Sequence, residues 1–209
     1  YGDHRDLHLS LRRQRQMCIR DSCNVVREIQ LDTWLHTSNT GLITTYDTNS
    51  NGSIHPSRKL PVGERSARWA LSEVYKVNKF GSNEPLEWKG PVFKDAKFES
   101  GKAFVTFEEG TDRGLRLDQD VDVGFVLAGK DKKFHHAKAR ITQSKEDKKP
   151  QVEIWCDDVK DPVAVRYAFS NLPIGGLMNA RELPAYPFRS DDWPMTPHQS
   201  TGSYLRNKK

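Results

Sequence analysis

The segment GLITTYDTNSNGSIHPSRKLPVGERSARWAL, residues 41–71, carries the clearest indication of the fold. It opens with a β-branched, apolar run over residues 41–47 that is typical of a strand buried in a sheet. A polar loop over residues 48–56 follows. After Pro61, apolar residues recur at helical spacing: Ala67, Ala70, Leu71, Val74 and Val77. This spacing predicts a helix from Val62 to Lys76, and the order strand, loop, helix indicates an α/β protein.

The sequence changes character on the amino-terminal side of this segment. Residues 24–31, NVVREIQL, are predicted to form a short helix. Residues 1–22 are strongly charged, show no sustained periodicity and begin with Tyr rather than Met. We interpret RRQRQMCIRDS, residues 12–22, as translated sequencing adaptor, which implies that an upstream part of the protein is missing. A natural, disordered basic arm is the alternative interpretation.

The sequence also changes beyond residue 84, where Gly, Ser and Pro cluster and short alternating apolar runs follow. These runs are Ala103 to Phe107, Val123 to Leu127, Ala137 to Ile141, Val152 to Cys156 and Val163 to Phe169. Alternation between turn signals predicts an antiparallel β-sandwich-like domain. We therefore expect a leader at 1–22, the end of an α/β domain at 23–84, the β domain at 85–194 and a disordered basic tail at 195–209. Residues 171–194, rich in Pro and Gly, are predicted to form a long loop.

The bulk composition excludes several classes of protein. The 209 residues have a net charge of +5, a mean hydropathy of −0.77 and no run of apolar residues long enough to span a membrane. The excess charge lies at the ends, because residues 1–22 carry five Arg against three Asp and the tail from Gln199 carries three cations. Residues 23–198 are therefore neutral overall, which argues against nucleic acid as a partner. Three scattered cysteines form neither a disulfide framework nor a zinc motif.

Several ordered motifs resemble one known family, the sialate O-acetylesterases. In the first half these are REIQ (27–30), SNTG (38–41), GSIHP (52–56), Lys59 and VGER (62–65). In the second half they are GPVF (90–93), DPVAVRYAF (161–169), NLP (171–173) and LPAYPFRSD (183–191). The similarity extends from about Asn24 to Trp193. The order and spacing of the motifs, more than any one of them, carry the resemblance.

The resemblance implies an SGNH-type hydrolase that removes O-acetyl groups from sialic acids or related acetylated sugars, without a metal or an organic cofactor. It implies a chain that contains the carboxyl-terminal end of an SGNH-type α/β/α domain followed by the β-sandwich-like domain. The family's serine nucleophile has no counterpart here, so we expect it to lie upstream and the fragment to be inactive alone. Secreted, periplasmic or lysosomal localisation follows by the same similarity.

His55 matches the histidine of the family's Ile-His-Pro motif, which implies the role of general base. A serine hydroxyl needs an adjacent group that accepts its proton and later returns it to the leaving alcohol, and imidazole titrates in the range that suits both transfers. Many SGNH enzymes place Asp three residues before this histidine, but Gly52 stands there. Asp47 is our candidate for the residue that orients the imidazole. An upstream acid or a backbone carbonyl is the alternative.

Three further residues are candidates for binding the acetylated sugar. Arg27 and Gln30 belong to a family motif and are expected to line the pocket, although an Arg near the end of an element is often a structural clamp. Asn39 is a possible donor to the substrate, or a turn residue before Thr-Gly. The competing hypothesis for the whole chain is a non-catalytic β-sandwich module that binds a glycan or a protein.

Overall fold

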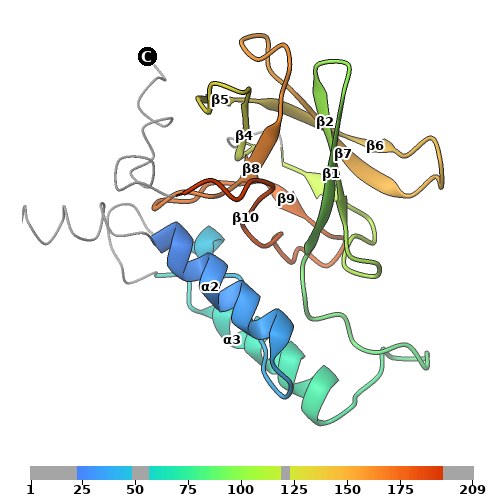
Figure 1. Cartoon of the computed structure of the whole chain (residues 1–209). Helices are drawn as coiled ribbons and strands as arrows, with labels where there is room; N and C mark the ends of the chain where they lie inside the picture. The colour runs from blue at the N-terminus through green and yellow to red at the C-terminus, as the bar shows by residue number, and fades with distance from the viewer. Residues whose placement is uncertain (1–22, 49–56, 119–122, 195–209) are drawn as a thin grey trace, which may run out of the picture.

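The computed structural model describes residues 23–48, 57–118 and 123–194. The predictions for the leader (1–22), for the tail (195–209) and for His55 lie outside the described residues. Helices occupy one end of the described part and β-strands the other (Figure 1). None of the helices described is long and apolar enough to cross a membrane.

Both predicted helices are present. Helix α2 spans Cys23–His36, so it continues five residues beyond the predicted segment. Helix α3 spans Leu60–Trp69 and runs on into the π-helical turn η2, Ala70–Val74, close to the predicted range. Pro61 lies in the first turn of α3, where its missing N–H costs no hydrogen bond and its fixed φ suits the helix.

The predicted strand at residues 41–47 is wrong. Residues 41–45 have no regular structure, and Tyr46–Thr48 form the 3-10 turn η1. The carbonyl groups of this segment accept hydrogen bonds from side chains and from the turn itself: Leu42 from the Tyr186 hydroxyl, and Thr44 from Arg65 at 2.6 Å. A β-branched run pairs as a strand only where a neighbouring strand offers its backbone, and no described segment does so here.

The strands in the described residues form two four-stranded sheets and one two-stranded sheet, with the orders β1-β2-β7-β6, β10-β8-β4-β5 and β3-β9. All of their pairings are antiparallel, as predicted for this part of the chain. The strands are β1 (Phe93–Glu99), β2 (Lys102–Phe107), β3 (Arg116–Leu117), β4 (Phe125–Ala128), β5 (Phe134–His136), β6 (Lys138–Gln143), β7 (Pro150–Trp155), β8 (Ala164–Tyr167), β9 (Leu177–Met178) and β10 (Phe188–Arg189).

One hydrophobic core joins the two large sheets. Ala103, Val105 and Phe107 alternate inward along β2, as the sequence predicted. By contrast, β4 and β8 are buried at every position, because neighbouring strands and loops cover both of their faces. Tyr46, from the turn η1 between α2 and α3, belongs to the same core. The Tyr46 side chain therefore packs the helical end against the β-rich part.

Residues 171–194 are mostly irregular, as predicted, apart from the short strands β9 and β10. This segment fastens helix α2 to the β-rich part. The Arg189 guanidinium donates to the Glu28 carboxylate at 2.6 Å, and the indole of Trp34 stacks on Tyr186 with ring centroids 5.3 Å apart. The motif LPAYPFRSD thus holds α2 in place. Its side chains contact residues of α2 that lie more than 100 positions earlier in the sequence.

Candidate functional site

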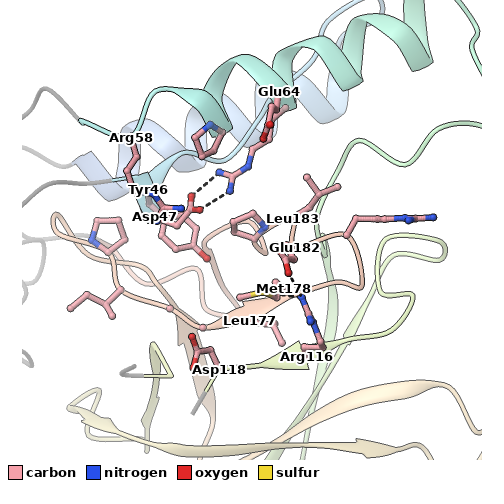
Figure 2. A pocket seen from close by; sticks show the side chains of 18 of the residues that line it. Tyr46, Asp47, Arg58, Glu64, Arg116, Asp118, Leu177, Met178, Glu182 and Leu183 are labelled. Carbon is pink, nitrogen blue, oxygen red and sulfur yellow. Dashed lines mark hydrogen bonds and ion pairs between the residues drawn. The ribbon is translucent and has the colours of Figure 1, made fainter. Parts of the chain in front are cut away.

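A cavity of about 1580 Å³ lies between the beginning of α3 and the small β3-β9 sheet (Figure 2). One wall consists of Tyr46, Asp47, the residues just before α3 and one side of α3 itself as far as Arg68. The other wall consists of residues 116–118, which include β3, and of segments from 173 to 184 that include β9. Elements far apart in the sequence therefore meet around it, as expected for a ligand site between two parts of a structure.

The wall on the α3 side is organised by an ion pair between Arg65 and Asp47. The guanidinium binds the carboxylate in a bidentate manner, with Nη1 to Oδ1 at 2.7 Å and Nη2 to Oδ2 at 2.6 Å, and it also donates to the Thr44 carbonyl. The Arg65 side chain is only 9 % exposed and that of Asp47 is 29 % exposed. Such a fork fixes both the position and the orientation of the Asp47 carboxylate at the cavity surface.

Two buried tyrosines lie side by side at the cavity, and one of them, Tyr46, lines it. The hydroxyl groups of Tyr46 and Tyr167 are 2.9 Å apart, and the Leu177 amide donates to the Tyr167 hydroxyl at 3.0 Å. Burial, and then the proximity of Tyr167, raises the pKa of Tyr46 well above its ordinary value; burial likewise raises the pKa of Tyr167. Both hydroxyls are therefore protonated near neutral pH. They link the α3 side of the cavity to β9 on the opposite side.

Gly175 allows the chain to cross this tyrosine pair. A Cβ atom at residue 175 would lie 2.4 Å from the Tyr167 hydroxyl, closer than any real contact. Only glycine therefore lets residues 173–177 run over Tyr167 while the Leu177 amide reaches its hydroxyl.

Removing the Tyr167 hydroxyl is expected to destabilise the protein. In Tyr167→Phe, the Leu177 amide and the Tyr46 hydroxyl both lose a buried partner, which costs about 1 to 2 kcal/mol of unfolding free energy. Urea denaturation measures this difference. Tyr75→Phe is the matched control, because the Tyr75 side chain is exposed and its change is expected to stay within about 0.5 kcal/mol. Equal effects of the two substitutions would contradict the role assigned to Tyr167.

Charged groups are numerous in the lining. Six cationic side chains face four carboxylates there, namely Arg58, Lys59, Arg65, Arg68, Arg116 and Arg181 against Asp47, Glu64, Asp118 and Glu182. Among the described residues, Arg58 and Lys59 have no ion-pair partner, whereas Arg116 is paired with Glu182 at 3.3 Å. A ligand that offers several oxygen acceptors fits this excess of donors. In the described ranges, no group of three or more His, Cys, Asp and Glu side chains is arranged to hold a metal ion.

The predicted site residues are only partly brought together. Asp47 lines the cavity. Arg27, Gln30 and Asn39 are not among its lining residues: Arg27 donates to the Ser170 carbonyl, Gln30 is exposed on α2, and Asn39 is exposed with a φ of 59°. A positive φ is typical of Asn in a turn, which was the alternative interpretation for Asn39. The contact of Arg27 likewise matches its alternative role as a structural clamp.

Sequence reasoning missed the five arginines that line the cavity, among them Arg65 and Arg116. Arg65 belongs to the VGER motif, but nothing in its sequence context indicated a partner 18 residues away. Arg116 lies in a charged stretch without a motif, and only the pairing of β3 with β9 brings it to the cavity. Its place in the VGER motif was the one signal available for Arg65.

Comparison with solved structures finds a similar enzyme. A structure of a carbohydrate acetylesterase from Xanthomonas citri is similar to this chain, with a TM-score of 0.68 and 33 % sequence identity over 81 % of the chain. The chain spans 36 % of the length of that enzyme. No protein-family profile matches the chain, and neither does any curated protein sequence. The match supports a relationship to carbohydrate esterases.

Proposed function

We propose that this chain forms the carboxyl-terminal part of a carbohydrate O-acetylesterase of the sialate type, which hydrolyses the acetyl esters of sugars. The observation that carries the proposal is the structural similarity to a carbohydrate acetylesterase at 33 % identity. A large cavity lined by donors is consistent with a substrate rich in oxygen atoms. Since the chain spans about a third of that relative, we assign the serine nucleophile to a part of the enzyme outside these residues.

In the proposed reaction, the serine hydroxyl attacks the acetyl carbonyl while an imidazole accepts its proton. The imidazolium then gives this proton to the sugar oxygen as the ester C–O bond breaks, and an acetyl-enzyme remains. A water molecule then attacks the acetyl-enzyme in the same way, which releases acetate and restores the serine hydroxyl. The chemistry requires one histidine at the cavity and a group that holds its ring.

We assign the histidine to His55, on the family's Ile-His-Pro motif. Two chain steps separate His55 from Ser57, which lines the cavity. Asp47, which precedes His55 by eight residues in the sequence, also lines the cavity. These two lining residues on either side of His55 in the sequence support the assignment.

Asp47 is our candidate for orienting the imidazole, and its ion pair with Arg65 is compatible with that role. Each carboxylate oxygen has two lone pairs, so the bidentate contact with Arg65 leaves acceptor capacity for an imidazole N–H. A carboxylate fixed by a buried guanidinium is a stiff support for a catalytic ring. An acid or a carbonyl from another part of the enzyme remains the alternative partner.

The exposed apolar surface of the helices supports the SGNH-type fold as part of the proposal. Large apolar side chains lie exposed on and directly after the two helices: Val26, Ile29, Leu35, Leu60, Leu71, Val74, Tyr75, Val77 and Phe80. Surfaces of this kind mark contact sites. We infer that they pack on the parallel sheet of an α/β domain to which α2 and α3 belong.

The proposal is tested by measuring acetate release with the full-length enzyme that carries this chain. We expect hydrolysis of O-acetylated sialic acid or of another acetylated sugar, together with slower turnover of 4-nitrophenyl acetate. Mass spectrometry after rapid acid quenching should detect an acetyl group on a serine, since acyl transfer proceeds through a covalent intermediate. Absence of acetate release from every acetylated sugar and from the chromogenic ester would refute the proposed function.

A further inference from the structure

We propose that the β-rich part recognises the sugar portion of the substrate, and that Arg116 contacts it directly. This inference rests on the proposed function and extends it, because it names the wall of the cavity that distinguishes a sugar ester from a simple acetate. The residue comes from β3, outside the elements that carry the assigned catalytic groups.

The two walls of the cavity have different origins. Asp47, Arg58 and Glu64 lie on the side of α3, whereas Arg116 and Asp118 lie across from them on the β3 side (Figure 2). If the acetyl group is held beside Asp47 and Ser57, the sugar part of the substrate faces the opposite wall. The β3-β9 sheet therefore occupies the position expected of a recognition surface for the alcohol part of the ester.

The Arg116 guanidinium has unused donors. Nη2 contacts the Glu182 carboxylate at 3.3 Å and the Met178 sulfur at 3.7 Å. Both contacts involve this one nitrogen, so within the described part of the chain Nη1 and Nε remain available to a ligand. The side chains of Arg116 and Glu182 are 52 % and 77 % exposed. An ion pair this exposed contributes little energy, so substrate oxygens can replace it at small cost.

The backbone beneath Arg116 is rigid. Arg116 pairs with Met178, and Leu117 pairs with the fully buried Leu177. Asn179, directly after β9, is buried, and its side-chain oxygen accepts hydrogen bonds from the backbone amides of Arg181 and Leu183 at 3.0 and 3.2 Å. A recognition residue is most selective when its backbone does not move, and both partners of this small sheet are anchored.

The chemistry of Arg116 specifies the kind of group it binds. A guanidinium has donors only and carries a permanent charge, so its partner is an acceptor: a sugar hydroxyl, ring or carboxylate oxygen. The surplus of cations over carboxylates in the lining favours the same class of ligand. 4-Nitrophenyl acetate offers, beyond the ester itself, only the weakly accepting oxygens of its nitro group. Arg116 should therefore contribute to sugar esters selectively.

The test compares Arg116→Ala with Arg113→Ala in the full-length enzyme. Arg113 is a matched control, because its side chain is 60 % exposed, it pairs with Glu84 as Arg116 pairs with Glu182, and it is not among the lining residues. For each protein, kcat/KM is measured on an acetylated sugar and on 4-nitrophenyl acetate. We expect Arg116→Ala to lose about 10- to 100-fold more on the sugar ester than on the chromogenic ester, the range for a hydrogen bond to a charged group.

Arg116→Lys should recover part of this difference, because it retains the charge but not the fork of donors. The control should show equal ratios for the two esters. Equal losses of Arg116→Ala on both substrates, or no loss on either, would overturn the inference while leaving the esterase function intact. A wild-type enzyme inactive on both esters would overturn the proposed function and this inference with it.

Discussion

His55→Ala is expected to lose roughly a thousand-fold or more in kcat on acetylated sugars, with little change in KM. Without an imidazole, the serine proton has no acceptor, and the sugar oxygen leaves as an unprotonated alkoxide. The residual rate comes from substrate binding and from stabilisation of the oxyanion alone. Wild type and variant are compared in the full-length enzyme, with acetate release as the readout and circular dichroism to verify the fold.

The control for this experiment is His36→Ala. His36 lies at the end of α2, is exposed and is not among the cavity residues, so its substitution should leave turnover within a factor of about two. The pH dependence adds a second readout, since the acidic limb of kcat/KM in the wild type should follow the titration of one imidazole. Normal turnover in His55→Ala would remove this residue from the mechanism.

Arg65→Met is expected to lower the free energy of unfolding by about 3 kcal/mol. Methionine fills a similar volume but leaves the Asp47 carboxylate without its counterion and the Thr44 carbonyl without its donor. The value lies at the lower end for broken buried pairs, because 29 % of the Asp47 side chain is exposed and water reaches it. Equilibrium denaturation in urea measures the change.

Arg68→Met is the matched control for this substitution. Arg68 is in the same helix and also lines the cavity, but within the described residues its side chain makes a single 3.1 Å hydrogen bond, to the Glu87 carbonyl, so the expected loss is below about 1 kcal/mol. The double variant Arg65→Met with Asp47→Asn should be more stable than the sum of the single effects predicts, because the unpaired carboxylate is then absent. Additive effects would show that the two side chains do not stabilise each other.

The regular elements were predictable where the apolar pattern alone determines the structure. The helical spacing from Ala67 to Val77 and the alternation along β2 depend on neighbours within the same element, and both predictions were correct. The run at 41–47 has equally strong strand propensity, yet its carbonyls are taken by Arg65 and Tyr186. Propensity does not reveal which distant side chains compete for a backbone, so this prediction failed.

The family motifs did not locate the residues of the candidate site. Asp47, which no motif supplied, lines the cavity, whereas Arg27, Gln30 and Asn39 do not. Arg116 reaches the cavity because β3 pairs with a strand some 60 residues away. That pairing depends on the packing of the whole β-rich part, and no local pattern near Arg116 encodes it.

The stacking of Trp34 on Tyr186, together with the Tyr46–Tyr167 hydroxyl contact, has a consequence for how the molecule comes apart. If the polypeptide were cleaved near residue 84 and the halves separated, each half would expose to water the aromatic surface that the other half now covers. Heat or denaturant that releases the helical end should therefore also destabilise the sheets.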